Sequence, residues 1–399
     1  MNTVQPKEMG FCSQRFARIN TVMRRYVDEQ KIAGIVTLVA RRGKIVHFEQ
    51  VGMANIEAGQ PMAADTIFRI YSMTKPITSV AVLMLLEEGH FRLADPVADY
   101  LSAFKAIKVL ERLPEGGERL VDAERPITIH HLLTHTAGLS YGWDELETTD
   151  AQYQALWHEL DTNPAFTLQE WLETLAKIPL LFQPGTRYGY SMATDVLGGL
   201  VQAVSGIPFD EFLRERIFAA LGMDDTAFDA PPEKLSRFAA NYGPREESGL
   251  KVIDAPQSSR YAQPTRHPSG GGGLVSTTGD YLRFAQMLLN RGELDGVRLL
   301  GRKTVELMTT NALPAGVYLN NDPTRGASFG LGVSLLEDVG KVQQLGSVGN
   351  YGWGGAANTN FWVDPKEELI GIIMLQFMPS DTYPVVVDFR NLTYQALVA

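Results

Sequence analysis

Cysteine is almost absent from this chain, which has a single one, Cys12, in 399 residues. One cysteine excludes an intrachain disulfide, so the fold is not held together in the manner of small secreted domains. The first twenty residues include Lys7, Glu8 and Arg15 and lack the continuous apolar core of a signal peptide. We therefore expect a cytoplasmic protein.

Positive charge and long apolar runs are also scarce. The chain has 36 Lys and Arg residues against 46 Asp and Glu residues, which gives a formal net charge of −10. Nucleic acids and anionic membranes attract basic surfaces, so we expect neither as a partner. No segment approaches the roughly 18 uninterrupted apolar residues that a transmembrane helix needs. A small molecule is the partner that this composition favours.

The residues that are present have the pattern of an ordinary globular protein of about two domains, with 45% hydrophobic and 21% charged residues. Both ends of the chain alternate strand-like and helical segments, whereas the middle has mainly helical periods. We predict an α+β fold in which an antiparallel sheet built from both chain ends is flanked by helices. The predicted sheet domain is 1–90 with 250–399, a mostly helical domain is inserted at 91–249, and the active site lies at their junction.

The individual elements follow from periodicity, caps and turns. An amphipathic helix is predicted over 12–31 and a hairpin over 32–40 and 44–51. Thr167 and Glu170 form a capping box for a helix that extends to Ile178. Further helices are predicted at 129–136, 195–204, 278–290 and 384–398, and strands at 330–336, 341–348, 356–364 and 368–376.

A serine and a lysine three residues apart, Ser72 and Lys75, begin the most apolar helical run of the chain. Residues three apart share one face of a helix, and Pro76 is tolerated in a first turn, where N–H groups lack intrahelical partners. Burial and the positive helix end favour a deprotonated lysine, which can accept the proton of a serine hydroxyl. The pair is a candidate nucleophile and base. For an isolated S-x-x-K match, a capping serine beside a solvated lysine is the structural alternative.

Two further segments have residues suited to the same chemistry. Tyr190 lies in the turn 184–191 before a predicted helix, where its phenol can act as a general base or proton relay. Glycines gather at 348–356 before a predicted strand, so a backbone N–H there can approach an oxyanion, and Trp353 can form a wall of the acyl pocket. The structural alternatives are a buried tyrosine with a satisfied hydroxyl and a plain glycine-rich turn.

Three other motifs have weaker claims. Ser140 lies in a G-x-S-x-G sequence, but the preceding residues predict a short helix instead of the buried strand that a nucleophile elbow requires. His131 and His135 have the spacing of helical zinc ligands but lack the glutamate of H-E-x-x-H, which favours a structural role. The tetraglycine 270–273 has no following Lys-Ser/Thr and is not a phosphate loop.

The order of these motifs resembles the serine β-lactamase and penicillin-binding-protein superfamily, and more narrowly the family VIII carboxylesterases. The resemblance implies that Ser72 is the acylated nucleophile, Lys75 its activating partner and Tyr190 the second general base and acid. It also implies that the N–H groups of Ser72 and Ala356 form an oxyanion hole and that Ser140 does no chemistry. Besides the motifs above, it covers the segments 129–139, 221–226 and 272–277.

The sequence departs from the β-lactamase pattern at two places. Met192 stands where the tyrosine motif has an asparagine, and Trp353-Gly354-Gly355 replaces Lys-Thr-Gly. The missing lysine removes a charge-assisted contact to carboxylates worth about 1.5 to 3 kcal/mol. Neutral esters are therefore the expected substrates, in contact with Tyr71 and the 353–355 segment.

We accordingly expect a serine carboxylesterase that hydrolyses neutral, short-acyl esters through an acyl-enzyme and needs neither a metal nor an organic cofactor. Within enzymes, the alternatives are a β-lactamase or D-amino-acid peptidase, and an acyltransferase that uses an alcohol acceptor. From a different class, the alternative is a silent penicillin-binding-like sensor or scaffold. The combination of Ser72, Lys75 and Tyr190 favours an enzyme.

Overall fold

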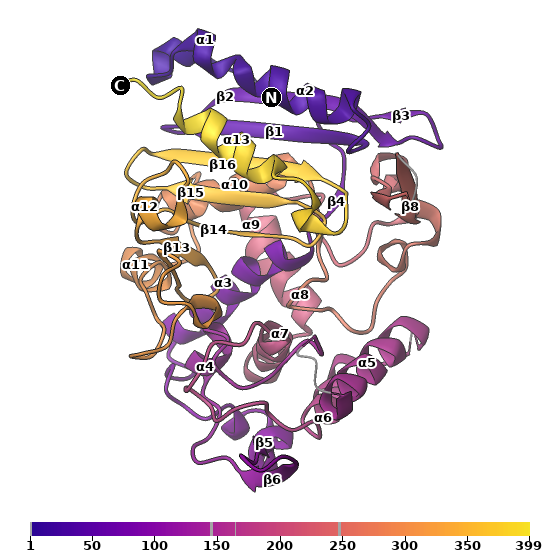
Figure 1. Ribbon diagram of the computed structural model, residues 1–399, viewed down its shortest axis with the longest axis vertical. Coiled ribbons are helices and arrows are strands. Elements are labelled where there is room, and N and C mark those ends of the chain that lie inside the picture. Colours follow the sequence, from indigo (N-terminus) through magenta and orange to yellow (C-terminus); the bar gives the residue numbers. More distant parts are fainter. Residues whose placement is uncertain (1, 144–146, 164, 246–248) are drawn as a thin grey trace.

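An eight-stranded antiparallel sheet is at the centre of the protein, whose computed structural model describes residues 2–143, 147–163, 165–245 and 249–399. The strand order is β12-β13-β14-β15-β16-β1-β2-β3 (Figure 1). The two ends of the chain meet where β1 pairs with β16, from Ile35 opposite Leu375 to Arg41 opposite Leu369. This confirms the predicted sheet. Its strands are β1 (Gly34–Arg41), β2 (Lys44–Asn55), β3 (Gln60–Pro61), β12 (Ala327–Phe329), β13 (Ser334–Leu336), β14 (Tyr351–Gly354), β15 (Asn360–Asp364) and β16 (Leu369–Leu375).

Helices cover both faces of the sheet. Figure 1 shows α2 (Arg18–Asp28) and α13 (Val385–Tyr394) on one face and α10 (Thr278–Leu289) on the other. Successive residues of a strand point to opposite faces. On β15, Trp362 packs against Phe389 of α13 at 5.4 Å between ring centroids, and Phe361 packs against Tyr281 of α10 at 4.9 Å. The central strands are therefore buried on both sides.

The helix α3 (Thr74–Glu87) joins the sheet to the helical region. All of its residues from Thr74 to Leu85 are buried, which is the pattern of a core helix. A short 3₁₀ turn, Tyr71–Met73, precedes it. The other helices are α1 (Ser13–Phe16), α4 (Ile129–Leu133), α5 (Glu147–Thr162), α6 (Leu168–Leu175), α7 (Ala193–Ser205), α8 (Phe209–Leu213), α9 (Ala219–Leu221), α11 (Arg302–Met308) and α12 (Val339–Val342).

Most predicted elements are confirmed. The predicted capping box is present, because the Thr167 side chain accepts from the N–H of Glu170 and the Glu170 carboxylate accepts from the N–H of Thr167. The strand predicted at 341–348 is wrong. There Asp338 caps the turn of helix α12 by accepting from the N–H groups of Gly340 and Lys341, so the local hydrogen bonds favour a helix.

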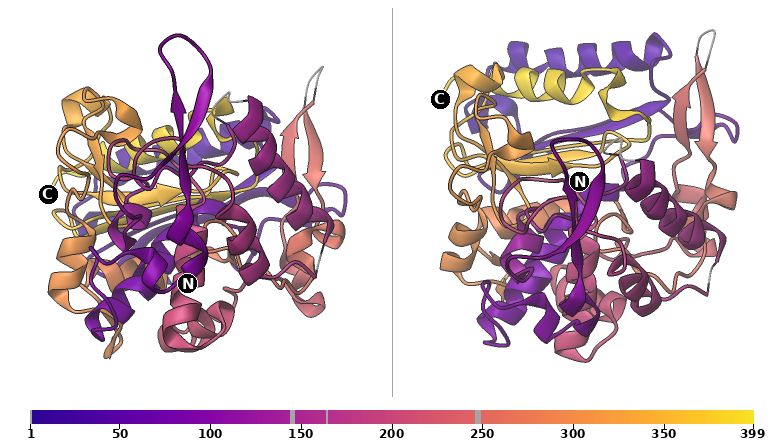
Figure 2. Two further views of the ribbon diagram at one scale, coloured as in Figure 1. Left: turned by 90° about the horizontal axis from the view of Figure 1, so that it is seen from below. Right: turned by 60° about the horizontal axis from the view of Figure 1, so that its bottom comes forward.

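Several short strand pairs lie outside the main sheet; β5–β6 falls in the region 91–249 predicted as mostly helical, and β7–β8 crosses its end. Figure 2 shows the hairpins β5–β6 and β7–β8 projecting from the body of the molecule. The pairs are β4 (Phe68–Arg69) with β9 (Val275–Ser276), β5 (Lys108–Arg112) with β6 (Glu118–Asp122), β7 (Asn241–Pro244) with β8 (Leu250–Asp254), and β10 (Glu293–Leu294) with β11 (Val297–Arg298).

Across the described residues, no single helix is both long and apolar enough to cross a bilayer. The helix α7 and the segment Phe209–Leu221 pass that test only as a pair, bent by 84°. Both parts of the pair contribute many residues to the hydrophobic core, as Leu197 and Phe212 illustrate.

Candidate active site

The 3₁₀ turn before α3 holds Ser72 at the edge of the core. Lys75 follows on the same face of the helix, and its Nζ atom donates to the Oγ atom of Ser72 at 3.1 Å. The side chain of Lys75 is fully buried, because α3 runs through the core. The alternative of a solvated lysine is therefore excluded by the structure.

Tyr190, in the segment before α7, contacts the same serine. Its hydroxyl donates to the Oγ atom of Ser72 at 2.7 Å, and Nζ of Lys75 lies 4.7 Å from the centre of its ring. The structure thus brings together the three residues that the sequence selected from segments more than a hundred residues apart. A hydroxyl at hydrogen-bond distance from an amine and a phenol can lose its proton to the unprotonated amine or to the deprotonated phenol.

Lys75 has two further partners, which the sequence did not reveal. Its Nζ atom donates to the hydroxyl of Tyr141 at 2.9 Å and to the carbonyl oxygen of Gly271 at 2.6 Å. The N–H of Gly271 donates to the Asp195 carboxylate at 3.0 Å, and the Ser269 hydroxyl donates to the same oxygen. The tetraglycine is therefore a tight turn, held by Asp195, that presents a carbonyl to the lysine.

The position of Tyr190 depends on His135. The carbonyl oxygen of His135 accepts from the N–H of Gly189 at 2.8 Å, and its ring lies 4.9 Å from the Tyr190 ring. Its Nδ1 atom is 3.4 Å from the hydroxyl of Ser191. One histidine thus contacts three consecutive residues around the phenol.

Burial keeps the polar groups around Lys75 uncharged at neutral pH. Burial raises the pKa of the Tyr141 phenol well above its ordinary value, and the neighbouring Tyr190 raises it further. Burial lowers the pKa of the His135 imidazole well below its ordinary value, and the charge of Lys75 adds to this effect. Among the described carboxylates, none makes an ion pair with Lys75. The amine is therefore held by neutral oxygens.

The glycine-rich segment forms strand β14 and the turn that follows it. A Cβ atom on Gly355 would lie 2.4 Å from the carbonyl oxygen of Ile70, so glycine is needed for the turn to approach the residues before Ser72. Ser72 and Ala356 line one groove. The N–H of Ala356 donates to no backbone oxygen of the described residues, and the first N–H groups of a helix lack intrahelical partners. Both amides are suited to bind an oxyanion.

The groove has a volume of about 980 Å³ and extends from Ser72 over β14 to α13. Trp143, Tyr190 and Trp353 form aromatic walls near the serine. The Nε1 atom of Trp353 lies 3.4 Å from the hydroxyl of Tyr190, and its ring packs edge-on against Phe329 at 5.1 Å. Gly354 and Gly355 also line the groove. The wall beside the serine is therefore apolar, with no lysine in the place of Trp353.

Tyr71 does not line this groove. Its backbone has φ of 42°, in the left-handed region that a bulky residue seldom adopts. Its ring packs against Tyr261 at 5.9 Å, and its hydroxyl accepts from Asn241 at 3.2 Å. This placement does not support the predicted contact between Tyr71 and the substrate.

The G-x-S-x-G serine and the paired histidine motif occupy structural positions in the fold. Ser140 is buried between α4 and α5, with no strand before it, and its Oγ atom accepts from the N–H of Gly142 at 2.8 Å. His131 completes a capping box with Thr128 at the start of α4. No group of three or more His, Cys, Asp or Glu side chains in the described ranges is arranged to hold a metal ion.

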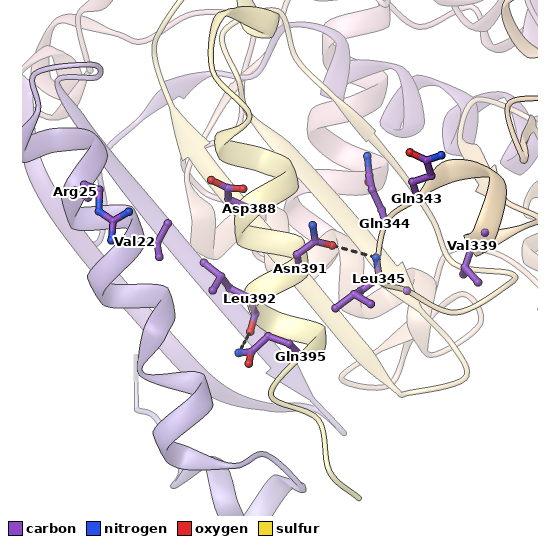
Figure 3. A pocket seen from close by; sticks show the side chains of 12 residues that line it. Val22, Arg25, Val339, Gln343, Gln344, Leu345, Asp388, Asn391, Leu392 and Gln395 are labelled. Carbon is purple, nitrogen blue, oxygen red and sulfur yellow. Dashed lines mark hydrogen bonds between the residues drawn. The ribbon is translucent and has the colours of Figure 1, made fainter.

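A separate hollow of about 730 Å³ lies between α2, α13 and the segment 339–346 (Figure 3). Arg25, Asp388 and Asn391 are among its lining residues, and Asn391 accepts from the N–H of Leu345 at 3.0 Å. None of the candidate catalytic residues lines it. The groove at Ser72 is therefore the place where their chemistry is available.

Known proteins resemble this chain over most of its length. The Beta-lactamase family model matches residues 19–394. Protein Rv1367c of Mycobacterium tuberculosis is 36% identical, covering 90% of this chain and 89% of its own, and esterase EstB of Burkholderia gladioli is 34% identical, covering 87% of each. The solved structure of EstCE1, described as a hydrolase with promiscuous acyltransferase activity, superposes with a TM-score of 0.80 at 26% identity, covering 96% of this chain and 99% of its own.

These similarities agree with the fold and with the groups around Ser72. A family model that spans nearly the whole chain, an esterase relative at 34% identity and a hydrolase with the same fold all indicate one kind of chemistry. The chain therefore belongs to the Beta-lactamase family and is a serine ester hydrolase.

Proposed function

We propose that the protein is a carboxylesterase that cleaves neutral, short-acyl esters through an acyl-enzyme on Ser72. The observation that carries the proposal is the position of the Ser72 Oγ atom, 3.1 Å from Nζ of Lys75 and 2.7 Å from the Tyr190 hydroxyl, at the floor of an open groove. Loss of the serine proton to this pair produces an alkoxide that attacks the ester carbonyl. The N–H groups of Ser72 and Ala356 would hold the resulting oxyanion.

Collapse of the tetrahedral intermediate requires a proton for the departing alcohol. Tyr190 and Lys75 are the groups in reach, so they return the proton that they took from Ser72. A water molecule then attacks the acyl-enzyme with the same pair as base. We further propose that the site lies at the junction of a sheet domain, 1–90 with 250–399, and a mostly helical domain, 91–249.

The substrate preference rests on the groove wall. Trp353, Gly354 and Gly355 are proposed to contact the substrate, and an indole at position 353 provides apolar surface and no ion pair for a carboxylate beside the scissile bond. An acyltransferase reaction is the second candidate, because EstCE1 is described as having such an activity and the groove can hold an alcohol in place of water.

A panel of 4-nitrophenyl esters of graded acyl length, with a chromogenic cephalosporin beside it, tests the proposal. We expect hydrolysis of the shorter neutral esters, little turnover of the cephalosporin, and no turnover of either by Ser72→Ala. Adding a small alcohol separates ester transfer from hydrolysis in the product analysis. Preferential cephalosporin turnover, or full esterase activity in Ser72→Ala, would contradict the proposed function.

A further inference from the structure

The end of the groove away from Ser72 is bounded by α13. Tyr383, Val387 and Arg390 line it from this helix and the turn before it, and Gln344 and Asn350 line it from the side of β13 and β14. Figure 1 shows α13 lying over β16 and β15, with β14 and β13 to one side. The groove therefore continues from the serine along the face of the sheet that α13 leaves open.

Arg390 is the cation at this end. Its guanidinium carbon lies 5.0 Å from the ring centre of Trp362, a fully buried residue of β15. In the described part of the chain, no oxygen accepts a hydrogen bond from Arg390 and no carboxylate pairs with it. The side chain is only partly exposed, and it faces the groove. A guanidinium has five N–H donors, and these are available to a ligand.

The charged groups near Arg390 do not satisfy it. Asp364 is the carboxylate whose negative charge acts on Arg390, but its hydrogen bonds go to other groups. One of its oxygens accepts from the Tyr394 hydroxyl at 2.7 Å, and the other accepts from the N–H groups of Lys366 and Glu367. Burial lowers the pKa of Arg390, and Tyr394 and Asp364 raise it, so the group stays charged at any physiological pH. Arg325 and Asp381 are the other charged residues that line the groove.

A partly desolvated cation without a partner is unfavourable unless a ligand uses it. Stacking on the Trp362 indole offsets part of this cost and fixes the plane of the guanidinium. A planar fork of donors suits a carboxylate or a phosphate, which accept two parallel hydrogen bonds. The chain as a whole has a net charge of −10, so an anionic group needs such a local cation to be held here.

We propose that Arg390 binds an anionic group, a carboxylate or a phosphate, at the remote end of an ester substrate whose acyl carbon lies at Ser72. The inference rests on the proposed function and extends its substrate class from neutral short-acyl esters to esters that are neutral beside the scissile bond and anionic at the far end. Arg390 overlies Trp362, which pairs with Gly352, and Gly352 precedes Ala356 by four residues. At about 3.3 Å per extended residue, these four residues separate the anionic group from the oxyanion amides by at most roughly 13 Å along the strand, since Ala356 lies in the turn after β14. Gly352 and Gly354 of β14 line the groove between them.

Paired substrates test this inference. One series is the 4-nitrophenyl monoesters of α,ω-dicarboxylic acids of increasing length, a second ends in a phosphonate, and each is compared with the methyl-ended ester of equal length. We expect the wild-type ratio of kcat/KM, anionic over methyl-ended, to rise with chain length and to reach its maximum at a spacer no longer than roughly 13 Å. Arg390→Met, which keeps an aliphatic stem over Trp362, should lower that ratio about tenfold to a hundredfold.

Matched variants make the result specific. Arg25→Met, on α2 at the other side of α13 (Figure 3), should leave the ratio unchanged. Arg390→Lys keeps the positive charge but loses the planar set of N–H donors, so its ratio of kcat/KM for anionic over methyl-ended esters should lie between those of wild type and Arg390→Met. If Arg390→Met does not fold, Arg390→Lys is the variant compared with wild type. The preferred anion is the one, carboxylate or phosphonate, whose series shows the larger fall in this ratio between wild type and Arg390→Met.

Equal ratios in wild type and Arg390→Met would overturn the inference, as would a loss caused by Arg325→Met instead. These outcomes are distinct from failure of the proposed function. That failure would appear as absent turnover of the methyl-ended esters by the wild-type protein.

Discussion

The hydroxyl of Tyr141 lies 2.9 Å from the Nζ atom of Lys75, which also donates to the carbonyl oxygen of Gly271 at 2.6 Å and to Oγ of Ser72 at 3.1 Å. The protonated amine has three N–H donors and these acceptors use all of them, whereas the neutral amine that accepts the Ser72 proton donates to two of the acceptors and directs its lone pair to Oγ. The amine is thereby held in one place beside the serine. Tyr141 provides a polar contact that Met192, at the position of the asparagine in β-lactamases, does not.

Tyr141→Phe should lower kcat/KM for a 4-nitrophenyl ester by about tenfold or more. The change leaves a buried donor of Lys75 unsatisfied, which costs about 1 to 3 kcal/mol, while the ring still packs against Trp157. Tyr188→Phe, in the same aromatic cluster, is the matched control and should stay within about threefold of wild type. If the two variants behave alike, Tyr141 does not hold the lysine.

Lys75→Ala and Tyr190→Phe should each reduce the acylation rate by on the order of 10²-fold to 10⁴-fold, and the double variant should be little worse than either. The reason is that one proton passes between groups that contact the same Ser72 oxygen. The burst of nitrophenol in stopped-flow experiments measures acylation. Losses that multiply in the double variant would show two independent contributions.

Trp353→Lys should shift preference toward substrates with a carboxylate beside the scissile bond. The lysine restores the cation of the β-lactamase pattern and removes an indole that packs against Phe329 and Tyr190. We expect the ratio of kcat/KM for a cephalosporin over a neutral ester to rise by about tenfold to a hundredfold. An unchanged ratio in a folded variant would mean that position 353 does not face the substrate.

Stability should fall as the pH decreases from about 6.5 to about 4, partly because of His47. Burial lowers the pKa of His47 to about 4, below the value of about 6.5 for an unfolded histidine, so the unfolded state binds the proton first. The contribution is fully present above pH 6.5 and is about 2 kcal/mol smaller at pH 5. Urea midpoints at pH 7.5 and 5 measure it.

His47→Gln provides the control for this effect. Glutamine can keep the hydrogen bond to the Thr37 hydroxyl, at 2.7 Å from Nε2 in the native protein, but it does not titrate. The variant should therefore lose less stability than wild type between the two pH values. An equal loss in both proteins would place the acid sensitivity elsewhere, for example at His267, whose pKa burial also lowers to about 4.

Local signals in the sequence were sufficient for the elements that carry the nucleophile. The spacing of Ser72 and Lys75 and the apolar run after them predict one helix face, and α3 has that arrangement. The Thr167 and Glu170 capping box is equally local. Because these features depend on neighbours within a few residues, a sequence pattern is enough to find them.

Contacts between distant segments were not predictable in the same way. Tyr141 is 66 residues from Lys75 in the sequence. The tetraglycine turn presents a carbonyl to Lys75 only because Asp195 of α7 holds it in place. Tyr141 directly follows the serine of the G-x-S-x-G motif, a motif that points to its serine and gives no signal for the residue after it. Tyr71 likewise has a left-handed φ and packs against Tyr261, 190 residues away, and no local pattern shows either feature.

The covalent intermediate on Ser72 is the central claim, and peptide mapping by mass spectrometry after rapid quench with a 4-nitrophenyl ester tests it most directly. We predict one acyl adduct, on the peptide that contains Ser72, present in Ser140→Ala and absent in Ser72→Ala, with esterase activity lower by on the order of 10⁴-fold in the latter. An adduct on Ser140, or wild-type turnover by Ser72→Ala, would contradict the account.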